Sequence, residues 1–175
     1  MVAPVTRQSL MAQALALAQA AGAAGEVPVG AVIADRRGRV LAAERNRMVE
    51  RGDPTAHAEM LAVRAACAAL GQGRLEGCDI YVTLEPCAMC AAAISFARLD
   101  RLYFGAYDPK GGGVEHGARV FAHSTCHHRP EVYGGIAEKR AGELLRRFFA
   151  ERRSGEEATA AGAAATDFVK TGEKP

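Results

Sequence analysis

Apolar residues recur along this chain in two periods, one typical of helices and one of strands. Met11, Ala14, Leu15 and Ala18 recur at helical spacing, which predicts an amphipathic helix over residues 6–20. Short runs rich in β-branched and aromatic residues, bounded by glycine and polar turns, predict strands. The predicted strands cover residues 27–35, 40–48, 79–86, 101–108 and 131–136.

Three further segments show helical spacing. One opens at "PTAHAE" and starts near residue 56, with Thr55 as its cap. Its inward face is expected to carry Met60, Val63, Cys67 and Leu70. The other two cover residues 87–97 and 137–153, and the last helix is expected to face inward with Ala141, Leu144, Leu145, Phe148 and Phe149.

The order of these elements predicts the fold class. The first two strands, joined by the turn at 36–39, form a hairpin, and strands then alternate with helices. This order predicts an α/β fold, a three-layer α/β/α sandwich on one mixed central sheet of about five strands. Residues 154–175 lack periodicity and are rich in Gly, Glu, Ala, Thr and Lys, so we expect one domain over 1–153 and a flexible tail.

Bulk composition narrows the class of protein only slightly. The 175 residues suit one domain, and 49% hydrophobic with 24% charged residues is an ordinary globular composition. A net charge of +2 does not indicate a nucleic-acid binder, although a local basic patch is compatible with it. The apolar N-terminal segment is interrupted by Gln8, Gln13 and Gln19, and no stretch is long enough to span a membrane, so we expect no membrane partner and a cytoplasmic location.

The cysteines favour a metal site over disulfides. Their number is odd and only two of them form a close pair, which is unlike a disulfide framework. Buried thiols together with a metal-binding pair fit this pattern better. The five are Cys67, Cys78, Cys87, Cys90 and Cys126.

Two short motifs carry the candidate chemistry. Cys87 and Cys90 follow Pro86 at a predicted strand-to-helix junction, where a helix start favours thiolates and directs both sulfurs toward one centre. With His57 they offer three ligands for a tetrahedral Zn²⁺, and a fourth position left for water is typical of a catalytic site. Glu59 stands close to such a metal without binding it, where it can move a proton between water and a substrate nitrogen.

Two other interpretations of the cysteine pair stay open. Pro-Cys-Ala-Met-Cys is compatible with a dithiol redox pair of thioredoxin type, which would leave His57 and Glu59 unexplained. A structural zinc site would need a fourth ligand, which Cys67, Cys78 or Cys126 would have to supply from unhelpful spacings.

Taken together, the motifs resemble a known family. His-x-Glu followed by Pro-Cys-x-x-Cys is the signature of zinc nucleobase deaminases. "EVPVGAV", "DPTAHAE", "YVTLEPCAMC", "FGAYDPK" and the closing "LLRRFFAERR" are similar to the bacterial tRNA-specific adenosine deaminases of the cytidine deaminase-like superfamily. The resemblance covers roughly residues 6–153.

The resemblance implies a reaction, a cofactor and partners. The reaction is the hydrolytic deamination of adenosine to inosine at wobble position 34 in the anticodon stem-loop of an arginine tRNA. It implies one Zn²⁺ per subunit on His57, Cys87 and Cys90, with zinc-bound hydroxide attacking C6 of a flipped adenine and Glu59 shuttling protons. It also implies a homodimer whose RNA site draws on both subunits.

The same resemblance implies the substrate contacts. Asn46 matches a residue that contacts the flipped nucleoside, and Asp108 and Lys110 match positions of anticodon-loop contacts. Arg129 and the arginines of the last helix are candidates for phosphate contacts, and Phe149 is a candidate for stacking on a base. From the residues alone, a turn explains Asn46 equally well, and a solvated loop explains Asp108 and Lys110 better. A solvated charged face is the usual explanation for the arginines, and core packing is favoured for at least one of Phe148 and Phe149. The expected substrate-binding residues are Glu26, Pro28, Val29, Asn46, Ala58, Glu85, Pro86, Asp108, Lys110, Arg129 and Phe149.

One region departs from the common family pattern. Lys110 is followed by three glycines, where many members have Thr-Gly-Ala. Four of the five histidines, His116, His123, His127 and His128, lie close to Cys126. A second metal site is conceivable there, although surface or hydrogen-bonded histidines are the commoner explanation.

Two rival functions stay open. Deamination of a free base or nucleotide such as guanine or cytosine would use the same zinc motif, although small cytidine deaminases commonly have Cys in place of His57. A binding module on the same fold would bind RNA without chemistry, but binding alone does not require Glu59.

Overall fold

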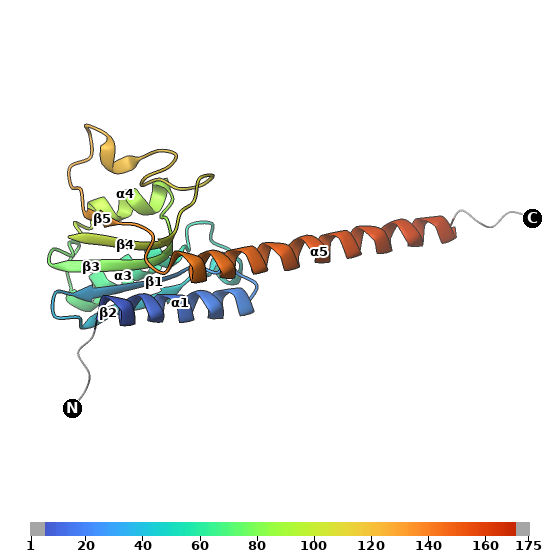
Figure 1. The fold of residues 1–175 in the computed structure, drawn as a ribbon, viewed down its shortest axis with the longest axis horizontal. Coiled ribbons are helices and arrows are strands. Elements are labelled where there is room, and N and C mark those ends of the chain that lie inside the picture. The colour runs from blue at the N-terminus through green and yellow to red at the C-terminus, as the bar shows by residue number, and fades with distance from the viewer. Residues whose placement is uncertain (1–5, 171–175) are drawn as a thin grey trace, which may run out of the picture.

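The computed structural model describes the backbone of residues 6–170 and the side-chain surroundings of residues 6–154 (Figure 1). A central sheet is flanked by helices, and one long helix projects from the body. The strands are β1 (Gly30–Asp35), β2 (Val40–Arg45), β3 (Cys78–Leu84), β4 (Arg101–Ala106) and β5 (Glu131–Tyr133). The helices are α1 (Arg7–Ala23), α2 (Met48–Arg51), α3 (Ala58–Leu70), α4 (Ala88–Phe96), η1 (Val120–Ala122) and α5 (Glu138–Lys170).

The five strands form one mixed sheet in the order β2-β1-β3-β4-β5. The hairpin partner β2 and the central strand β3 both pair antiparallel with β1, whereas β3–β4 and β4–β5 are parallel pairs. The helix α4 connects the parallel strands β3 and β4, as such a pair requires. The predicted hairpin, the five strands and the mixed sheet are therefore confirmed.

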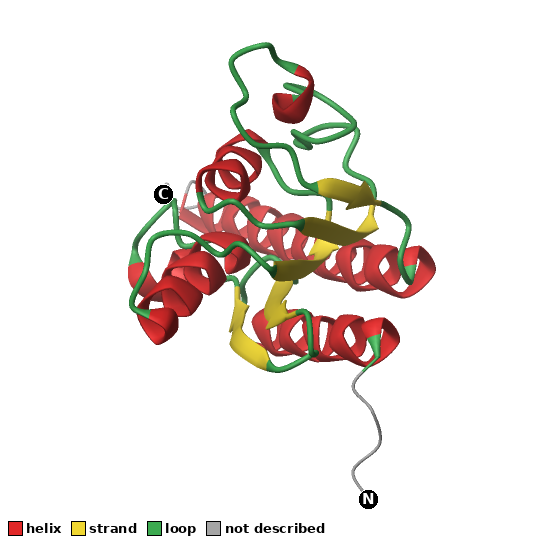
Figure 2. Ribbon diagram, turned by 90° about the vertical axis from the view of Figure 1, so that its left-hand side faces the viewer, coloured by secondary structure: helices red, strands yellow, loops and turns green. Residues whose placement is uncertain are grey.

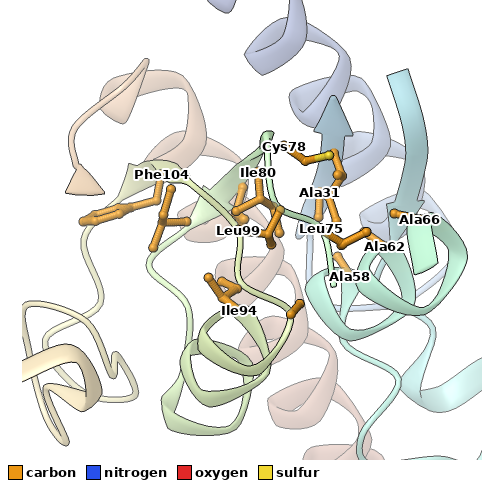
Figure 3. Packing of buried hydrophobic residues seen from close by; sticks show 14 of the residues in the cluster. Ala31, Ala58, Ala62, Ala66, Leu75, Cys78, Ile80, Ile94, Leu99 and Phe104 are labelled. Atoms are coloured by element: carbon orange, nitrogen blue, oxygen red, sulfur yellow. The ribbon is translucent and has the colours of Figure 1, made fainter. Parts of the chain in front are cut away.

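Helices cover both faces of the sheet (Figure 2). Ile33 and Ile80 belong to the core beneath α3 and α4, while their neighbours Val32 and Tyr81 belong to the core beneath α1 and α5. This alternation follows from the two-residue period of a strand whose faces are both covered. Figure 3 shows the α3–α4 side, where one cluster runs from Phe104 through Ile80 and Leu99 to the alanines of α3. The three-layer sandwich is confirmed.

The first helix forms as predicted and is slightly longer. Thr6 caps it, because its side chain accepts from the Ser9 amide while the Ser9 hydroxyl accepts from the Thr6 amide. The helix ends at Ala23, three residues beyond the predicted end, and buries the predicted apolar face. No helix in the described part of the chain is long and apolar enough to cross a membrane.

The inward face of α3 differs from the prediction. Met60 is partly exposed, and Val63, Cys67 and Leu70 only border the core. Thr55 is not the helix cap either, because its amide and hydroxyl both donate to Asp53 and His57 occupies the cap position. Small residues make up most of the buried face, which consists of Ala58, Glu59, Leu61, Ala62 and Ala66.

The C-terminal helix also departs from expectation. It continues from Glu138 to Lys170, across the boundary at residue 153 where a flexible tail was predicted, and residues 171–175 lie outside the described residues. The flexible-tail assignment stays a prediction. Phe148 is 8% exposed and faces inward as expected, whereas Phe149 is 44% exposed, so the inward assignment of Phe149 was wrong.

One glycine fixes how closely α1 lies on the sheet. A Cβ atom added to Gly30 of β1 would lie within 3 Å of the Ala14 carbonyl oxygen and the Ala18 amide nitrogen. These are backbone atoms of α1, which cannot turn aside as a flexible side chain does. The helix therefore packs at this distance only because position 30 has no side chain.

We therefore predict that Gly30→Ala lowers the free energy of unfolding by about 3 kcal/mol, the upper part of the overpacking range. Equilibrium urea unfolding measures this as a lower midpoint at an unchanged slope. Gly73→Ala is the matched control, because nothing lies within 4 Å of a Cβ atom there. Equal midpoints for the two variants would contradict the close packing of α1.

Candidate metal centre and active site

Three predicted ligands meet at the starts of two helices. His57 is the N-cap residue of α3, Cys87 is the N-cap residue of α4, and Cys90 lies in the first turn of α4. The His57 Nδ1 atom lies 3.7 Å from the Cys87 sulfur and 3.5 Å from the Cys90 sulfur. All three ligand atoms lie within 4.8 Å of one another, so the sequence-predicted triad is brought together.

These distances fit a tetrahedral zinc ion. Zn–S and Zn–N bonds of ordinary length at a tetrahedral angle separate sulfur from nitrogen by about 3.6 Å. Among the described residues, this is the one group of three or more His, Cys, Asp or Glu side chains arranged to hold a metal ion. With three protein ligands, a tetrahedral ion keeps a fourth position for water.

Hydrogen bonds among Cys87, Cys90 and His57 change the pKa values of all three side chains. Hydrogen bonds from Cys90 and from the His57 ring lower the pKa of Cys87 to about 4, against the opposing effect of burial. The pKa of Cys90 is raised, first by its bond to Cys87 and then by burial, and the pKa of His57 is raised by its bond to Cys87. A thiolate at Cys87 is a ligand ready for a cation.

Glu59 lies two residues after His57, on the buried face of α3, and is 4% exposed. Burial raises the pKa of its carboxyl group above the ordinary value, while the charge of His57 acts in the opposite direction. A bound metal cation would also oppose burial. A buried carboxyl group beside a metal centre is suited to accept and release a proton during a reaction.

Asn46 is held in place by buried partners, and the residue after it is bonded to the segment before His57. It is buried, its amide donates to the Val29 carbonyl, and its side-chain nitrogen makes a long contact of 3.5 Å with Glu26. Glu26 is also buried and accepts from the Glu50 amide at 2.9 Å. The Arg47 amide donates to the Ala56 carbonyl, directly before His57. Glu26 therefore orients the Asn46 loop.

Glu85 is buried, and its carboxylate is occupied by the protein itself. It accepts hydrogen bonds from the backbone of Asp108 and of residues 114–116, and from the His116 ring. Burial would raise the pKa of Glu85, but these bonds outweigh it, and the pKa is lowered. The structure shows Glu85 holding a loop, and its expected contact with substrate stays a prediction.

The other predicted substrate residues fall into two sets. Pro28, Val29, Ala58 and Pro86 are buried, and Ala58 and Pro86 are the sequence neighbours of the metal ligands His57 and Cys87. The second set lies toward solvent: Asp108 is partly exposed, and Lys110, Arg129 and Phe149 are exposed. These substrate contacts stay predictions.

The histidine-rich segment forms hydrogen bonds and no second metal group within the described residues. The rings of His123 and His128 bond to the carbonyls of Ala118 and Leu99, and His116 bonds to Glu85. Cys126 bonds to the His128 carbonyl. The second site considered from the sequence is therefore not formed here.

Sequence reasoning missed the residues that build the loop beside the metal centre. Gly112 and Gly113 are buried against Glu85 and the start of α4, and no Cβ atom fits at either position. The run of three glycines was the available signal, because glycine often marks a close backbone approach.

The fold and the metal centre define a zinc-dependent deaminase, and comparison with known families agrees. The model of the cytidine and deoxycytidylate deaminase zinc-binding region matches residues 4–106. The chain belongs to this family.

Within the family, the chain is similar to tRNA-specific adenosine deaminases. It is 58% identical to the tRNA-specific adenosine deaminase of Agrobacterium fabrum over 84% of this chain and 96% of that protein. A solved structure from a study of A-to-I editing by tRNA:A34 deaminases superposes with a TM-score of 0.78 at 58% identity, covering 79% of this chain and 100% of the other. The guanine deaminase of Nitrosomonas europaea superposes with a TM-score of 0.73 at 26% identity, covering 83% and 86%.

We predict that the purified protein contains about one zinc ion per chain, in keeping with one three-ligand site. Cys90→Ser should lose most of this zinc, because a hydroxyl replaces a thiolate ligand. Cys126→Ser is the matched control and should retain it, since Cys126 bonds to a carbonyl away from the triad. Elemental analysis by mass spectrometry measures the ratio, and zinc retained at full stoichiometry in Cys90→Ser would contradict the assignment.

Proposed function

We propose that this protein deaminates adenosine to inosine at wobble position 34 of a tRNA anticodon, with arginine tRNA as its substrate. The triad of His57, Cys87 and Cys90 with Glu59 beside it carries the proposal. The similarity to tRNA-specific adenosine deaminases over most of the chain supports the choice of substrate. A tRNA substrate places the protein in the cytoplasm.

The residues of the centre divide the work. His57, Cys87 and Cys90 hold the zinc ion, which supplies an activated water when bound. Glu59 takes a proton at its carboxylate oxygen and returns it to the nitrogen that leaves as ammonia. Asn46, fixed by Val29 and Glu26, holds the nucleoside that has been flipped out of the RNA.

The RNA-binding surface combines an aromatic ring with positive charge. Phe149 is exposed on α5 and offers a face on which a base can stack. Arg146, Arg147 and Arg153 are exposed on the same helix and can meet phosphates. Arg152 is already engaged, because it donates to the Gly25 carbonyl and lies over the Phe148 ring. It anchors α5 to the body.

The protein is proposed to act as a homodimer with one zinc ion in each subunit. An apolar stripe on α4 supports this arrangement, since Met89, Ala92, Ala93 and Phe96 recur at helical spacing, with Phe96 exposed and the other three partly exposed. Phe96 is 76% exposed, which is unusual for a large aromatic side chain. We propose that this stripe packs against a second copy of the chain.

Phe96→Glu should therefore convert the dimer into a monomer, because a charge would have to be buried without a partner. Size-exclusion chromatography with light scattering measures the molar mass. Val40→Glu is the control, since Val40 is an exposed apolar residue on the edge strand β2. A Phe96→Glu variant that keeps the mass of two chains would contradict this interface, and a monomeric wild type would contradict the dimer.

For the reaction itself, we predict inosine at position 34 of an arginine-tRNA anticodon hairpin incubated with the protein. Glu59→Gln should slow its formation by about 10²–10⁴-fold, the usual contribution of a general acid–base group. Its zinc content should match the wild type, because glutamine has the same shape and Glu59 is not one of the three ligands. Nucleoside mass spectrometry measures inosine.

Free guanine and cytosine are assayed in parallel. A zinc-loaded wild type that produces no inosine from the hairpin would overturn the tRNA assignment. Turnover of a free base in that case would retain the zinc chemistry and move the protein toward the small-substrate deaminases. A Glu59→Gln variant as fast as the wild type would overturn the role of Glu59.

A further inference from the structure

One buried carboxylate closes the loop formed by residues 108–116, which we call the 108–116 loop. Glu85 Oε2 accepts from the Asp108 amide at 3.1 Å, at the beginning of the loop. Glu85 Oε1 accepts from the amides of Glu115 and His116, each at 2.9 Å, at its end. Both ends of the loop are therefore fixed on a residue two positions before the metal ligand Cys87.

The middle of the loop lies directly on the metal-ligand turn. The Gly113 amide donates to the Pro86 carbonyl at 2.8 Å, and Gly112 forms a β-bridge with Cys87. A Cβ atom at Gly112 would lie 2.5 Å from the Glu85 oxygen, and one at Gly113 would lie 2.5 Å from the Ala88 amide nitrogen. A shift of this loop would therefore displace the turn that carries Cys87.

The tip of the loop carries the residues expected to meet RNA. The Asp108 carboxylate accepts from the amides of Lys110 and Gly111, at 3.1 and 3.0 Å, which folds the tip into a compact turn. Lys110 is exposed at this turn. The position of Lys110 relative to the metal ligands is thus set by Asp108, which folds the turn, and by Glu85, which binds the Asp108 amide.

His116 is the one side chain in the described structure that donates to Glu85. Its Nδ1 atom lies 2.7 Å from Oε2, and because a carboxylate only accepts, Nδ1 is the donor. The ring also packs edge-on against Tyr107, with 6.0 Å between ring centroids. The Asp108 amide and the His116 ring therefore both donate to Glu85 Oε2, which joins the beginning of the loop to its end.

We propose that His116 is a positioning residue for the RNA substrate: through Glu85 it holds the 108–116 loop, and with it Asp108 and Lys110, at the correct distance from the metal centre. The inference rests on the proposed function, since it assigns RNA as the molecule that the loop meets. His116 itself touches no reacting atom. Its effect is therefore expected in the binding of the hairpin and not in the chemical step.

His116→Ala should raise KM for the anticodon hairpin about tenfold and leave kcat within about twofold, because an interaction that places substrate equally in the ground and transition states changes KM alone. His116→Asn should restore KM, since its amide nitrogen stands where Nδ1 of the ring lies. His123→Ala is the matched control. Its ring bonds only to the Ala118 carbonyl in the same segment.

Amide hydrogen exchange tests the hold on the loop without any substrate. His116→Ala should speed exchange at residues 108–116, while His116→Asn and His123→Ala should not. If the wild type forms no inosine, the proposed function fails, and exchange still decides whether His116 holds the loop. Unchanged exchange and KM in His116→Ala, or a fall in zinc content with kcat, would overturn the proposal.

Discussion

The convergence of two helix starts on one point is the constraint on which the rest of the structure depends. His57 stands at the start of α3 and Cys87 at the start of α4, and their ligand atoms meet only if the two helices lie close together. Ala62 and Ala66 of α3 and Ala91 of α4 are fully buried, so small side chains make this approach possible. Helix starts also favour the thiolates that a cation needs.

The order of the strands brings a second loop to the same place. Because β3 and β4 are parallel neighbours, their carboxyl ends lie at the same end of the sheet, and the segments that follow them leave the sheet there. Glu85 lies in the segment after β3, and the loop after β4 folds back onto its carboxylate. In open α/β sheets ligands usually bind outside the carboxyl ends of the strands. The metal ligands and the exposed Lys110 are thus connected through one buried acid.

The local pattern of the sequence predicted the strands, the hairpin and the metal triad, because each depends on residues close in the chain or on a fixed motif. The local pattern failed where contacts with residues distant in the sequence determine which side chains are buried. Met60 was assigned to the core by its helical spacing, but the buried face of α3 is a different one, which includes Leu61 and Ala62, and Met60 is partly exposed. Thr55 was assigned as a cap, but Asp53 binds it first. Phe149 is spaced for burial and remains 44% exposed, because no described part of the chain covers it.

The fold alone does not decide which substrate is used. The guanine deaminase of Nitrosomonas europaea superposes on this fold at 26% identity, so one fold serves both a free base and a base within RNA, and the substrate has to be argued from the residues of the site. A free base is held best when it is enclosed, whereas RNA needs an open rim with charge and stacking surfaces. Here Lys110 and Phe149 are both exposed, on the loop after β4 and on α5. Exposed groups of this kind fit the RNA contacts proposed for Lys110 and Phe149, and in the proposal for His116 the position of Lys110 depends on how firmly Glu85 and His116 hold the loop.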